Sequence, residues 1–282
     1  MNFFNKSYHI NEDEIKSRLN KILNQKISSA EKIEIYRQIL GMIDLTTLEG
    51  SDNNEKITLL CDMAQSFHLA GKNIPDVAAV CVYPPFVALA KSQLSGTNIQ
   101  VASVAGAFPS GQSPIKVKLA EISYAIEQGA DEIDMVISRG KFLEGDYQAV
   151  YDEIAAISEV CKDVHLKVIL ETGELETLKN IRRASVIAIS AGADFIKTST
   201  GKIQPAATTE AFLVMLDSIK EHYQNTNKKI GIKPAGGISE PEQAIQYYLL
   251  VKDVLGEEWL NPQLLRFGAS RLASKILDRI KN

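Results

Sequence analysis

Short apolar runs alternate with longer amphipathic segments along most of this chain, from residue 39 onward. Many of the longer segments, such as residues 115–130 and 146–161, space their apolar residues as one face of a helix does. The eight predicted strand runs are residues 39–46, 77–83, 99–106, 132–137, 165–172, 195–200, 230–236 and 264–270. Strands that alternate with helices predict parallel βαβ units, and eight such units predict an α/β fold, the (β/α)8 TIM barrel, rather than an open sheet.

The length of 282 residues is enough for one such barrel of about 250 residues and a short addition. We expect the addition at the N-terminus, where residues 1–38 are rich in Asn, Lys and Glu and show the spacing of two short amphipathic helices. Residues 39–282 would then form the barrel. The helical extension would pack against it or serve as an oligomer contact.

Composition and missing motifs exclude several classes of protein. The net charge of −4 argues against a nucleic-acid-binding surface, and no apolar run approaches the about 18 residues of a membrane span. The three cysteines form no CxxC pair and the N-terminus lacks a signal-peptide core, so we expect a cytoplasmic protein. Walker A and GxGxxG motifs are both missing and the four histidines are scattered, so we expect neither a nucleotide cofactor nor a metal ion.

The alternation within the strand runs separates two sets of side chains. In five of the runs one parity is wholly apolar and the other carries the charges. The apolar parity must face the surrounding helices, so the charged parity faces the barrel axis. Lys197 is placed there by analogy, because its own run alternates less clearly. The barrel interior is thus expected to hold four acids and four bases, namely Asp44, Glu132, Asp134, Glu171, Lys167, Lys197, Lys233 and Arg266.

Buried charges are costly unless they are paired, so this group indicates either stabilising salt bridges or a functional site. For Glu132 and Arg266 we favour salt bridges to neighbouring side chains. For the three lysines the functional interpretation is stronger. Lysine is seldom buried without a partner, and barrel enzymes have their active sites at the carboxyl ends of the strands.

Two of these lysines, Lys197 and Lys233, lie at similar depths on adjacent predicted strands. A second ammonium group nearby, together with desolvation, lowers the pKa of a lysine and leaves a free amine that can attack a carbonyl carbon. Asp134 and Lys167, on the two preceding strands, are placed to relay protons. The four residues therefore predict covalent catalysis through a lysine.

The segments after the last three predicted strands are rich in glycine: Gly201-Lys202, Gly236-Gly237 and Gly268-Ala269-Ser270. Exposed backbone N–H groups in such turns favour an anion, and the last two turns are close to predicted helix starts. Loops after the last strands of a barrel commonly bind phosphate. The chain is therefore expected to bind a phosphorylated small molecule.

Six motifs, in chain order, resemble those of the deoxyribose-phosphate aldolase family, which consists of class I, Schiff-base-forming aldolases. They are DLTTL (44–48), GADEIDMVI (129–137), LKVILETGEL (166–175), ADFIKTSTGK (193–202), KPAGGI (233–238) and RFGAS (266–270). The resemblance covers residues 40–275, and the combination of ADFIKTSTGK with KPAGG is highly specific. It implies reversible cleavage of 2-deoxy-D-ribose 5-phosphate to D-glyceraldehyde 3-phosphate and acetaldehyde, in deoxyribonucleoside catabolism and without a cofactor.

Carried over by motif, the resemblance implies that Lys197 forms the Schiff base and that the charge of Lys233 lowers its pKa. Asp134 would be the general acid and base, with Lys167 beside it in the proton relay. Cys81 has inward parity, and for this residue we favour a small buried side chain over a chemical role. The implied substrate-binding residues are Asp44, Thr46, Cys81, Thr200, Gly201, Lys202, Gly236, Gly237 and Ser270.

This sequence departs from the family pattern near its C-terminus. Arg271 follows Ser270, where many relatives have a second small hydroxyl residue, and the final residues KILDRIKN lack the tyrosine of some members. We expect Arg271 in the first turn of the last helix, either solvated or in contact with the substrate phosphate.

Two other functions stay open. The chain could be a related Schiff-base aldolase that acts on another sugar phosphate, or a non-catalytic sugar-phosphate sensor. The intact lysine pair argues against the sensor, because binding a phosphate does not require a neutral amine. As partners we expect a small sugar phosphate and acetaldehyde, no nucleic acid, no membrane, and a second copy of the chain in a homo-oligomer such as a dimer.

Overall fold

The computed structural model describes residue 4 and residues 6–281, in which strands and helices alternate as the sequence predicts. Residues 1–3, 5 and 282 of the expected extension and barrel lie outside the described residues. The strands are β1 (Ile43–Thr46), β2 (Ala79–Val82), β3 (Gln100–Ala105), β4 (Glu132–Val136), β5 (His165–Ile169), β6 (Phe195–Lys197), β7 (Gly231–Lys233) and β8 (Phe267–Ala269). The α-helices are α1 (Glu12–Leu23), α2 (Ser29–Leu40), α3 (Asn54–Ala64), α4 (Val87–Gln93), α5 (Ile115–Glu127), α6 (Arg139–Leu143), α7 (Tyr147–Val160), α8 (Leu178–Ser190), α9 (Thr209–Thr226), α10 (Pro241–Leu255) and α11 (Leu272–Lys281). Three short 3-10 helices are η1 (Phe67–Ala70), η2 (Pro84–Phe86) and η3 (Glu257–Trp259).

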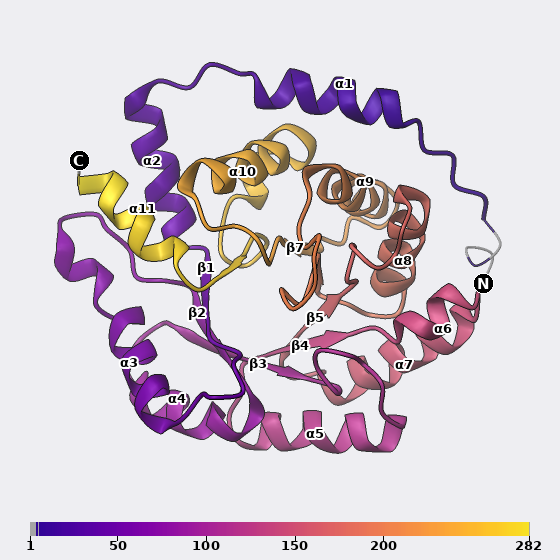
Figure 1. Ribbon diagram of the computed structural model, residues 1–282, viewed down its shortest axis with the longest axis horizontal. Coiled ribbons are helices and arrows are strands. Elements are labelled where there is room, and N and C mark those ends of the chain that lie inside the picture. The colour runs from indigo at the N-terminus through magenta and orange to yellow at the C-terminus, as the bar shows by residue number, and fades with distance from the viewer. Residues whose placement is uncertain (1–3, 5, 282) are drawn as a thin grey trace.

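The strands form a ring of parallel neighbours with the helices outside it (Figure 1). They pair in the order β7-β6-β5-β4-β3-β2-β1-β8, and every pairing is parallel. Two further parallel bridges, Ile232 with Leu265 and Ala235 with Gly268, connect the two ends of this sheet and nearly close the ring. The predicted (β/α)8 TIM barrel is therefore confirmed.

The first apolar run differs most from its prediction. Residues 39–46 read as one strand, but Ile39 and Leu40 end helix α2, and β1 begins only at Ile43. Helix α2 thus extends two residues past residue 38, where the sequence places the end of the extension. Both side chains are fully buried, and a buried helix end looks like a buried strand when only apolar residues are compared.

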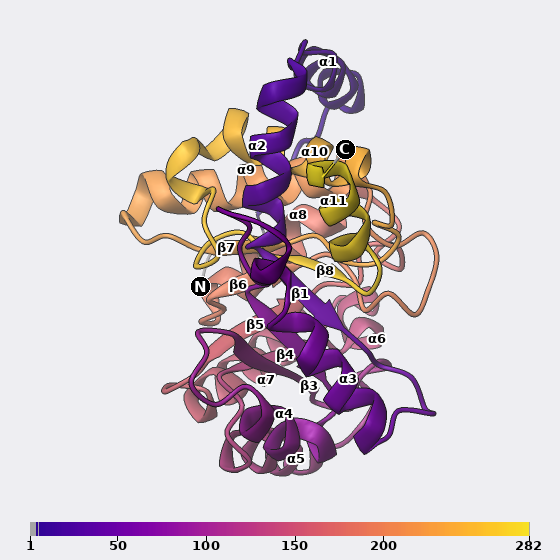
Figure 2. The same cartoon turned by 90° about the vertical axis from the view of Figure 1, so that its left-hand side faces the viewer.

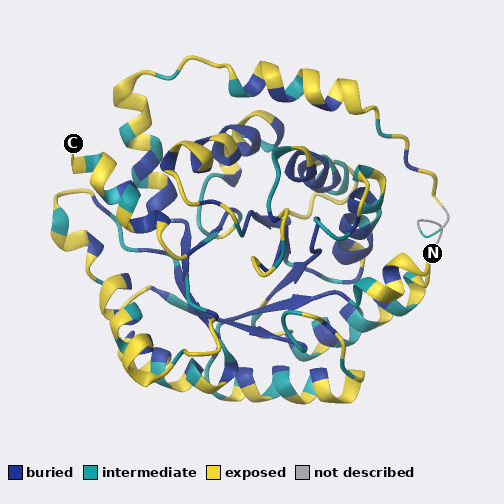
Figure 3. Cartoon of the chain, viewed as in Figure 1, coloured by how far each residue is buried: buried dark blue, intermediate teal, exposed yellow. Residues whose placement is uncertain are grey.

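The alternation along the strands separates two layers of side chains, and Figure 3 shows the strands buried at the centre of the molecule. Outward-facing residues such as Ile43, Ile133 and Val168 belong to the main hydrophobic core between sheet and helices. The inward-facing residues Cys81 and Ala102 belong instead to a small second cluster inside the barrel. The interior also holds fully buried charged side chains such as Asp134 and Lys167, which is unusual for a protein core and marks where function is to be sought.

The two N-terminal helices pack on the outside of the barrel helices (Figure 2). Helix α1 lies against α9 and α10, and α2 lies against α10 and α11. The buried face of α1 consists of Ile15, Leu19 and Ile22. On its flank, Arg18 donates two hydrogen bonds of 2.8 Å to the carboxylate of Asp217 in α9. Apolar burial and a bidentate ion pair therefore hold α1 in place.

Replacing Leu19 with Ala should lower the free energy of unfolding by about 2–3 kcal/mol, because it opens a cavity beneath α1. Urea denaturation measures this change. Lys16 is exposed on the same helix, and Lys16→Ala should change the free energy by less than about 0.5 kcal/mol. Equal unfolding free energies for Leu19→Ala and the unchanged chain would show that α1 does not stabilise the barrel.

Candidate active site

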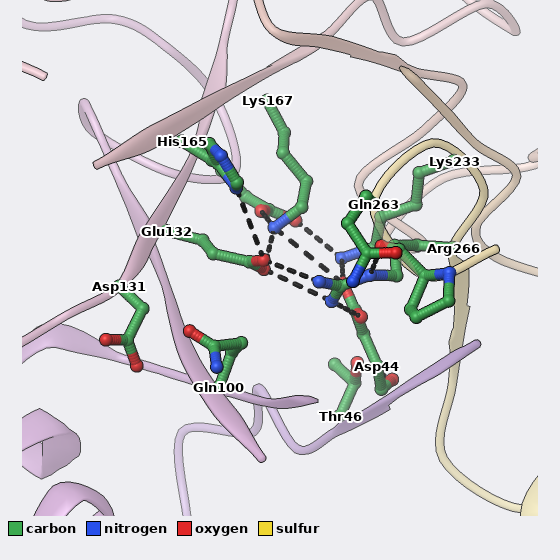
Figure 4. A network of polar contacts seen from close by, with 12 residues as sticks. Asp44, Thr46, Gln100, Asp131, Glu132, His165, Lys167, Lys233, Gln263 and Arg266 are labelled. Carbon is green, nitrogen blue, oxygen red and sulfur yellow. Dashed lines mark hydrogen bonds and ion pairs between the residues drawn. The ribbon is translucent and has the colours of Figure 1, made fainter. Parts of the chain in front are cut away.

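Seven of the eight charged side chains expected in the barrel interior meet there, and all seven are buried. They come from β1, β4, β5, β6, β7 and the residue before β8. Figure 4 shows part of this network, in which Lys167, Lys233 and Arg266 point toward carboxylates on β1 and β4. We call the seven residues the charged network: Asp44, Glu132, Asp134, Lys167, Lys197, Lys233 and Arg266.

Glu132 and Arg266 form the salt bridges that the sequence analysis favours for them. Arg266 Nη2 lies 2.7 Å from Glu132 Oε1, and Arg266 Nη1 lies 2.7 Å from Asp44 Oδ1. Glu132 also accepts a short hydrogen bond from Lys167. Burial alone would raise the pKa of Glu132, but Lys167 and Arg266 outweigh burial and lower it. This end of the network is therefore fully charged and fixes Lys167 in position.

Asp134 is the centre of the other end, because three lysines share its carboxylate. Its Oδ2 accepts hydrogen bonds from Lys197 Nζ at 2.7 Å and from Lys233 Nζ at 2.8 Å. Its Oδ1 accepts one from Lys167 Nζ at 3.1 Å. Burial opposes ionisation of Asp134, but the three ammonium groups outweigh it and hold its pKa well below the usual value. One ionised carboxylate thus gathers three amines around a single point.

The lysines differ in how many carboxylates they contact, and their pKa values differ accordingly. Burial lowers the pKa of each lysine. Lys167 and Lys233 each contact a carboxylate besides Asp134, and these negative charges outweigh burial and raise their pKa values. For Lys233 the second carboxylate is Asp44, whose Oδ2 lies 2.5 Å from Nζ.

Lys197 has the opposite balance. Among the described residues, Asp134 is its one carboxylate partner. Burial, with the positive charge of Lys233, outweighs this contact and lowers the pKa of Lys197. The network therefore keeps one lysine closer to the neutral form beside a permanent cation.

A cavity of about 640 Å³ opens at the carboxyl ends of β1, β6, β7 and β8. Lys197 lines it, and no other described member of the charged network does. Of the predicted site residues, the structure brings together at this cavity Thr46, Lys197, Thr200, Gly201, Lys202, Gly236, Gly237 and Ser270. Of the three lysines in the charged network, the one with the lowered pKa is thus the one that a small molecule in the cavity would reach.

Two residues expected at the pocket from the resemblance, Asp44 and Cys81, do not line the cavity. Asp44 lies two residues before Thr46 on β1, and its carboxylate forms ion pairs with Arg266 and Lys233. Cys81 is fully buried, and burial raises the pKa of its thiol to about 11. Cys81 is thus a small buried residue, the interpretation that the sequence analysis favours.

Glu171 also departs from its expected place among the interior charges. Strand β5 ends at Ile169, and Glu171 has a left-handed backbone with φ of 57°. Its carboxylate accepts hydrogen bonds from Thr200 and Arg139 instead of joining the charged network. The inward parity fails here because the alternation of a strand no longer applies beyond its last residue.

The glycine segments pack closely where the loops after β6 and β7 meet. Gly236 has φ of 81°, and a Cβ at this position would lie 2.9 Å from Gly201 Cα, so only glycine fits. The N–H of Lys202, expected to face a phosphate, instead donates to Thr200 Oγ1 at 3.1 Å. The hydroxyl takes this donor because it lies within the same turn.

The outer wall of the cavity carries three cationic residues: Lys202, Arg271 and Lys275. Arg271 is exposed and immediately precedes α11, so it lies just before the first turn of that helix rather than in it. Lys202 Nζ donates to Glu49 Oε1 at 2.9 Å. The wall suits an anionic group, whereas no group of three or more His, Cys, Asp or Glu among the described residues is placed to hold a metal ion.

Glu49 and Lys275 also line the cavity, although neither is among the site residues predicted from the sequence. Glu49 lies three residues after β1, where barrel enzymes carry functional loops, and this position was the available signal. Lys275 is one turn into α11, and nothing in its local sequence distinguishes it from an ordinary solvated lysine.

Comparison with known proteins places this geometry in a family. The model of the DeoC/LacD family aldolases matches residues 39–249. The chain belongs to this aldolase family. It is therefore a carbon–carbon lyase, and the resemblance carried by the six motifs is confirmed.

Individual relatives agree with the family. The chain is 48% identical to deoxyribose-phosphate aldolase of Homo sapiens, a match that covers 84% of this chain and 78% of the human protein. The Mus musculus deoxyribose-phosphate aldolase is 46% identical with the same coverage. The solved structure of the tetrameric deoxyribose phosphate aldolase from Aeropyrum pernix is 25% identical, has a TM-score of 0.68, and covers 97% of this chain and 99% of that one.

The charged network predicts how this aldolase responds to acid. The pKa values of Asp44, Glu132 and Asp134 are lower in the fold than in an unfolded chain, where they are about 4. The stability they contribute is therefore complete above about pH 4 and is lost as the pH falls through the folded-state values. Urea denaturation at successive pH values should show the free energy of unfolding falling steeply below about pH 4.

Glu132→Gln removes one of the titrating groups. Its free energy of unfolding should fall less steeply in the same range, by up to about 1.4 kcal/mol per pH unit. Identical slopes in the variant and the unchanged chain would mean that Glu132 has an ordinary pKa in the fold.

Proposed function

We propose that this chain reversibly cleaves 2-deoxy-D-ribose 5-phosphate to D-glyceraldehyde 3-phosphate and acetaldehyde through a Schiff base on Lys197. The observation that carries the proposal is the position of Lys197, which combines a lowered pKa with access to the cavity. The names of the human and mouse relatives support this substrate. The reaction would serve the breakdown of deoxyribonucleosides.

In the cleavage direction, the free amine of Lys197 attacks C1 of the open-chain sugar to give a carbinolamine. The carbinolamine takes up a proton on its hydroxyl group and loses water, which gives an iminium ion. Removal of the proton from the C3 hydroxyl then breaks the C2–C3 bond, which releases glyceraldehyde 3-phosphate and leaves an enamine. A proton added at C2 gives the iminium of acetaldehyde, and water hydrolyses it to acetaldehyde and the free amine. The iminium accepts the electron pair of the broken bond, so the chemistry requires no cofactor.

We assign the proton transfers to Asp134, with Lys167 beside it. Asp134 Oδ2 lies 2.7 Å from Lys197 Nζ, within reach of the proton that this ammonium must lose. When the neutral enamine forms, the cluster loses one positive charge, and the pKa of Asp134 rises so that its carboxylate can hold a proton. Lys233 stays charged between Asp44 and Asp134 and keeps the pKa of Lys197 low.

We place the substrate phosphate at the outer wall of the cavity, beside the loops after β6, β7 and β8. Arg271 and Lys202 bring positive charge to this wall, and the exposed ion pair of Lys202 with Glu49 is weak enough to exchange for a phosphate. The residues that would bind the substrate are Thr46, Thr200, Gly201, Lys202, Gly236, Gly237 and Ser270.

The two alternative functions make different demands on the site. A sugar-phosphate sensor needs the cationic wall but has no use for Lys197 at the cavity with a lowered pKa. A Schiff-base aldolase for another sugar phosphate would keep Lys197 and differ in the carbonyl compound it releases. Acetaldehyde as the trapped compound therefore separates our proposal from both.

We also propose that the chain is a cytoplasmic homo-oligomer, in which residues 1–38 are an extension of a barrel formed by residues 39–282. The tetrameric assembly of the Aeropyrum pernix enzyme supports self-association. All three cysteines are free, as is usual in a reducing compartment. No helix in the described part of the chain is long and apolar enough to cross a membrane.

Reductive trapping tests the proposal directly. Borohydride added with acetaldehyde should reduce the iminium to a stable ethyl group, and peptide mapping should find it on Lys197. Lys197→Arg should abolish the label, because a guanidinium does not form the imine. A label on Lys167 or Lys233 would refute the assignment, and a chain without any label would favour the sensor.

A further inference from the structure

Glu171 is a fully buried acid outside the charged network, and the proposed chemistry does not use it. It lies two residues after β5 and has φ of 57°, a conformation that favours glycine or asparagine over glutamate. A long acidic side chain at such a position has a conformational cost, and such costs concentrate at functional sites. The structure shows what the side chain of Glu171 does there.

The carboxylate of Glu171 holds Thr200 by two hydrogen bonds. Glu171 Oε1 accepts from the backbone N of Thr200 at 3.1 Å, and Oε2 accepts from Thr200 Oγ1 at 2.5 Å. Arg139 Nη1 adds an ion pair to Oε2 at 3.1 Å. Arg139 also donates to the backbone oxygens of Pro109 and Ser110, at 3.2 and 2.9 Å. The cluster thus ties together the segments that follow β3, β4, β5 and β6.

Thr200 passes this constraint to the cavity. Its hydroxyl donates to Glu171 and at the same time accepts from the backbone N of Lys202 at 3.1 Å. The hydroxyl proton of Thr200 therefore points to Glu171, and its oxygen faces the N–H of Lys202. Hydrogen bonds linked in this way strengthen one another. Thr200, Gly201 and Lys202 all line the cavity, whereas Glu171 does not.

We propose that Glu171 is a positioning residue that sets the shape of the 200–202 turn and, through it, the affinity for the phosphate group of the substrate. This inference rests on the proposed function, which places the phosphate beside that turn. Glu171 touches no reacting atom. It acts on the phosphate end of the cavity and leaves the Lys197 end unchanged.

The variant Glu171→Gln tests the inference. Its amide offers one acceptor oxygen instead of two and cannot pair with Arg139, so the turn loses its support. We expect KM for 2-deoxyribose 5-phosphate to rise about tenfold or more, with kcat changed far less. The kcat/KM for unphosphorylated 2-deoxyribose should stay the same, and so should borohydride trapping of acetaldehyde at Lys197.

Glu174→Gln is the matched control. Glu174 Oε2 also contacts Arg139, at 3.0 Å from Nε, but its side chain is 42% exposed and does not line the cavity. This variant should leave KM for both substrates unchanged. An increase equal to that of Glu171→Gln would show that the charge around Arg139, rather than the bonds to Thr200, sets phosphate affinity, and would overturn the inference.

Glu171→Gly separates the side chain from the backbone. Glycine adopts a φ of 57° without strain, so this variant should fold even if Glu171→Gln does not. It should raise KM for the phosphorylated sugar as Gln does, because it also lacks the carboxylate. A normal KM in Glu171→Gly, or equal effects on phosphorylated and unphosphorylated sugars, would overturn the inference.

A failure of the proposed function would give results different from a failure of the inference about Glu171. If it is wrong, the unchanged chain gives no acetaldehyde label at Lys197 and no turnover of either sugar. If only the role of Glu171 is wrong, the unchanged chain is labelled and active, and the Glu171 variants show no preference between the two sugars.

Discussion

The carboxylate of Asp134, shared by three ammonium groups, is the interaction on which this site depends. The carboxylate carries one negative charge and cannot neutralise three ammonium groups, so the lysines compete for it. Lys167 and Lys233 each have a second carboxylate, and Lys197 does not. The lysine with the weakest support is also the one at the cavity. Burial, together with the charge of Lys233, outweighs its single carboxylate partner and lowers its pKa, which creates a nucleophile.

Such a cluster is stable only if every other charge in the barrel is balanced. Arg266 bridges Glu132 and Asp44 at the far side of the network, so neither carboxylate is buried without a partner. The packing around Lys233 is also tight. A Cβ on Gly268 would lie 3.1 Å from Lys233 Cε and 2.8 Å from Ala235 Cβ, so a side chain at this position would displace its neighbours. A charged interior and a glycine strand end are therefore parts of one arrangement that holds the lysines in contact.

Strand parity predicts six of the seven residues of the charged network, and Lys197 is added by analogy with the neighbouring strands. Parallel pairing places Asp134 opposite Lys167 and Lys197 opposite Lys233, so inward-facing residues on neighbouring strands must meet. This also explains why Lys197 could be placed by analogy although its own run alternates poorly. The eight-unit barrel was equally accessible, because each strand lies within its apolar run.

Features that depend on where a strand stops could not be predicted in this way. Glu171 has inward parity by counting, but β5 ends two residues earlier and the backbone turns its side chain toward Thr200. Depth along the barrel axis was also inaccessible from the sequence, and Asp44, which the resemblance implies at the pocket, does not line it. Lys275 reaches the cavity from a helix, and only the packing of that helix determines this.

The unequal pKa values of the lysines are the central claim, and NMR titration of lysine labelled with carbon-13 at Cε measures them residue by residue. The signal of Lys197, assigned by its loss in Lys197→Arg, should titrate below the ordinary value of about 10.4, while those of Lys167 and Lys233 titrate above it. In Lys233→Leu the titration of Lys197 should move to higher pH, because the neighbouring positive charge is gone. A Lys197 signal that titrates at or above the ordinary value, or that does not respond to Lys233→Leu, would contradict this account.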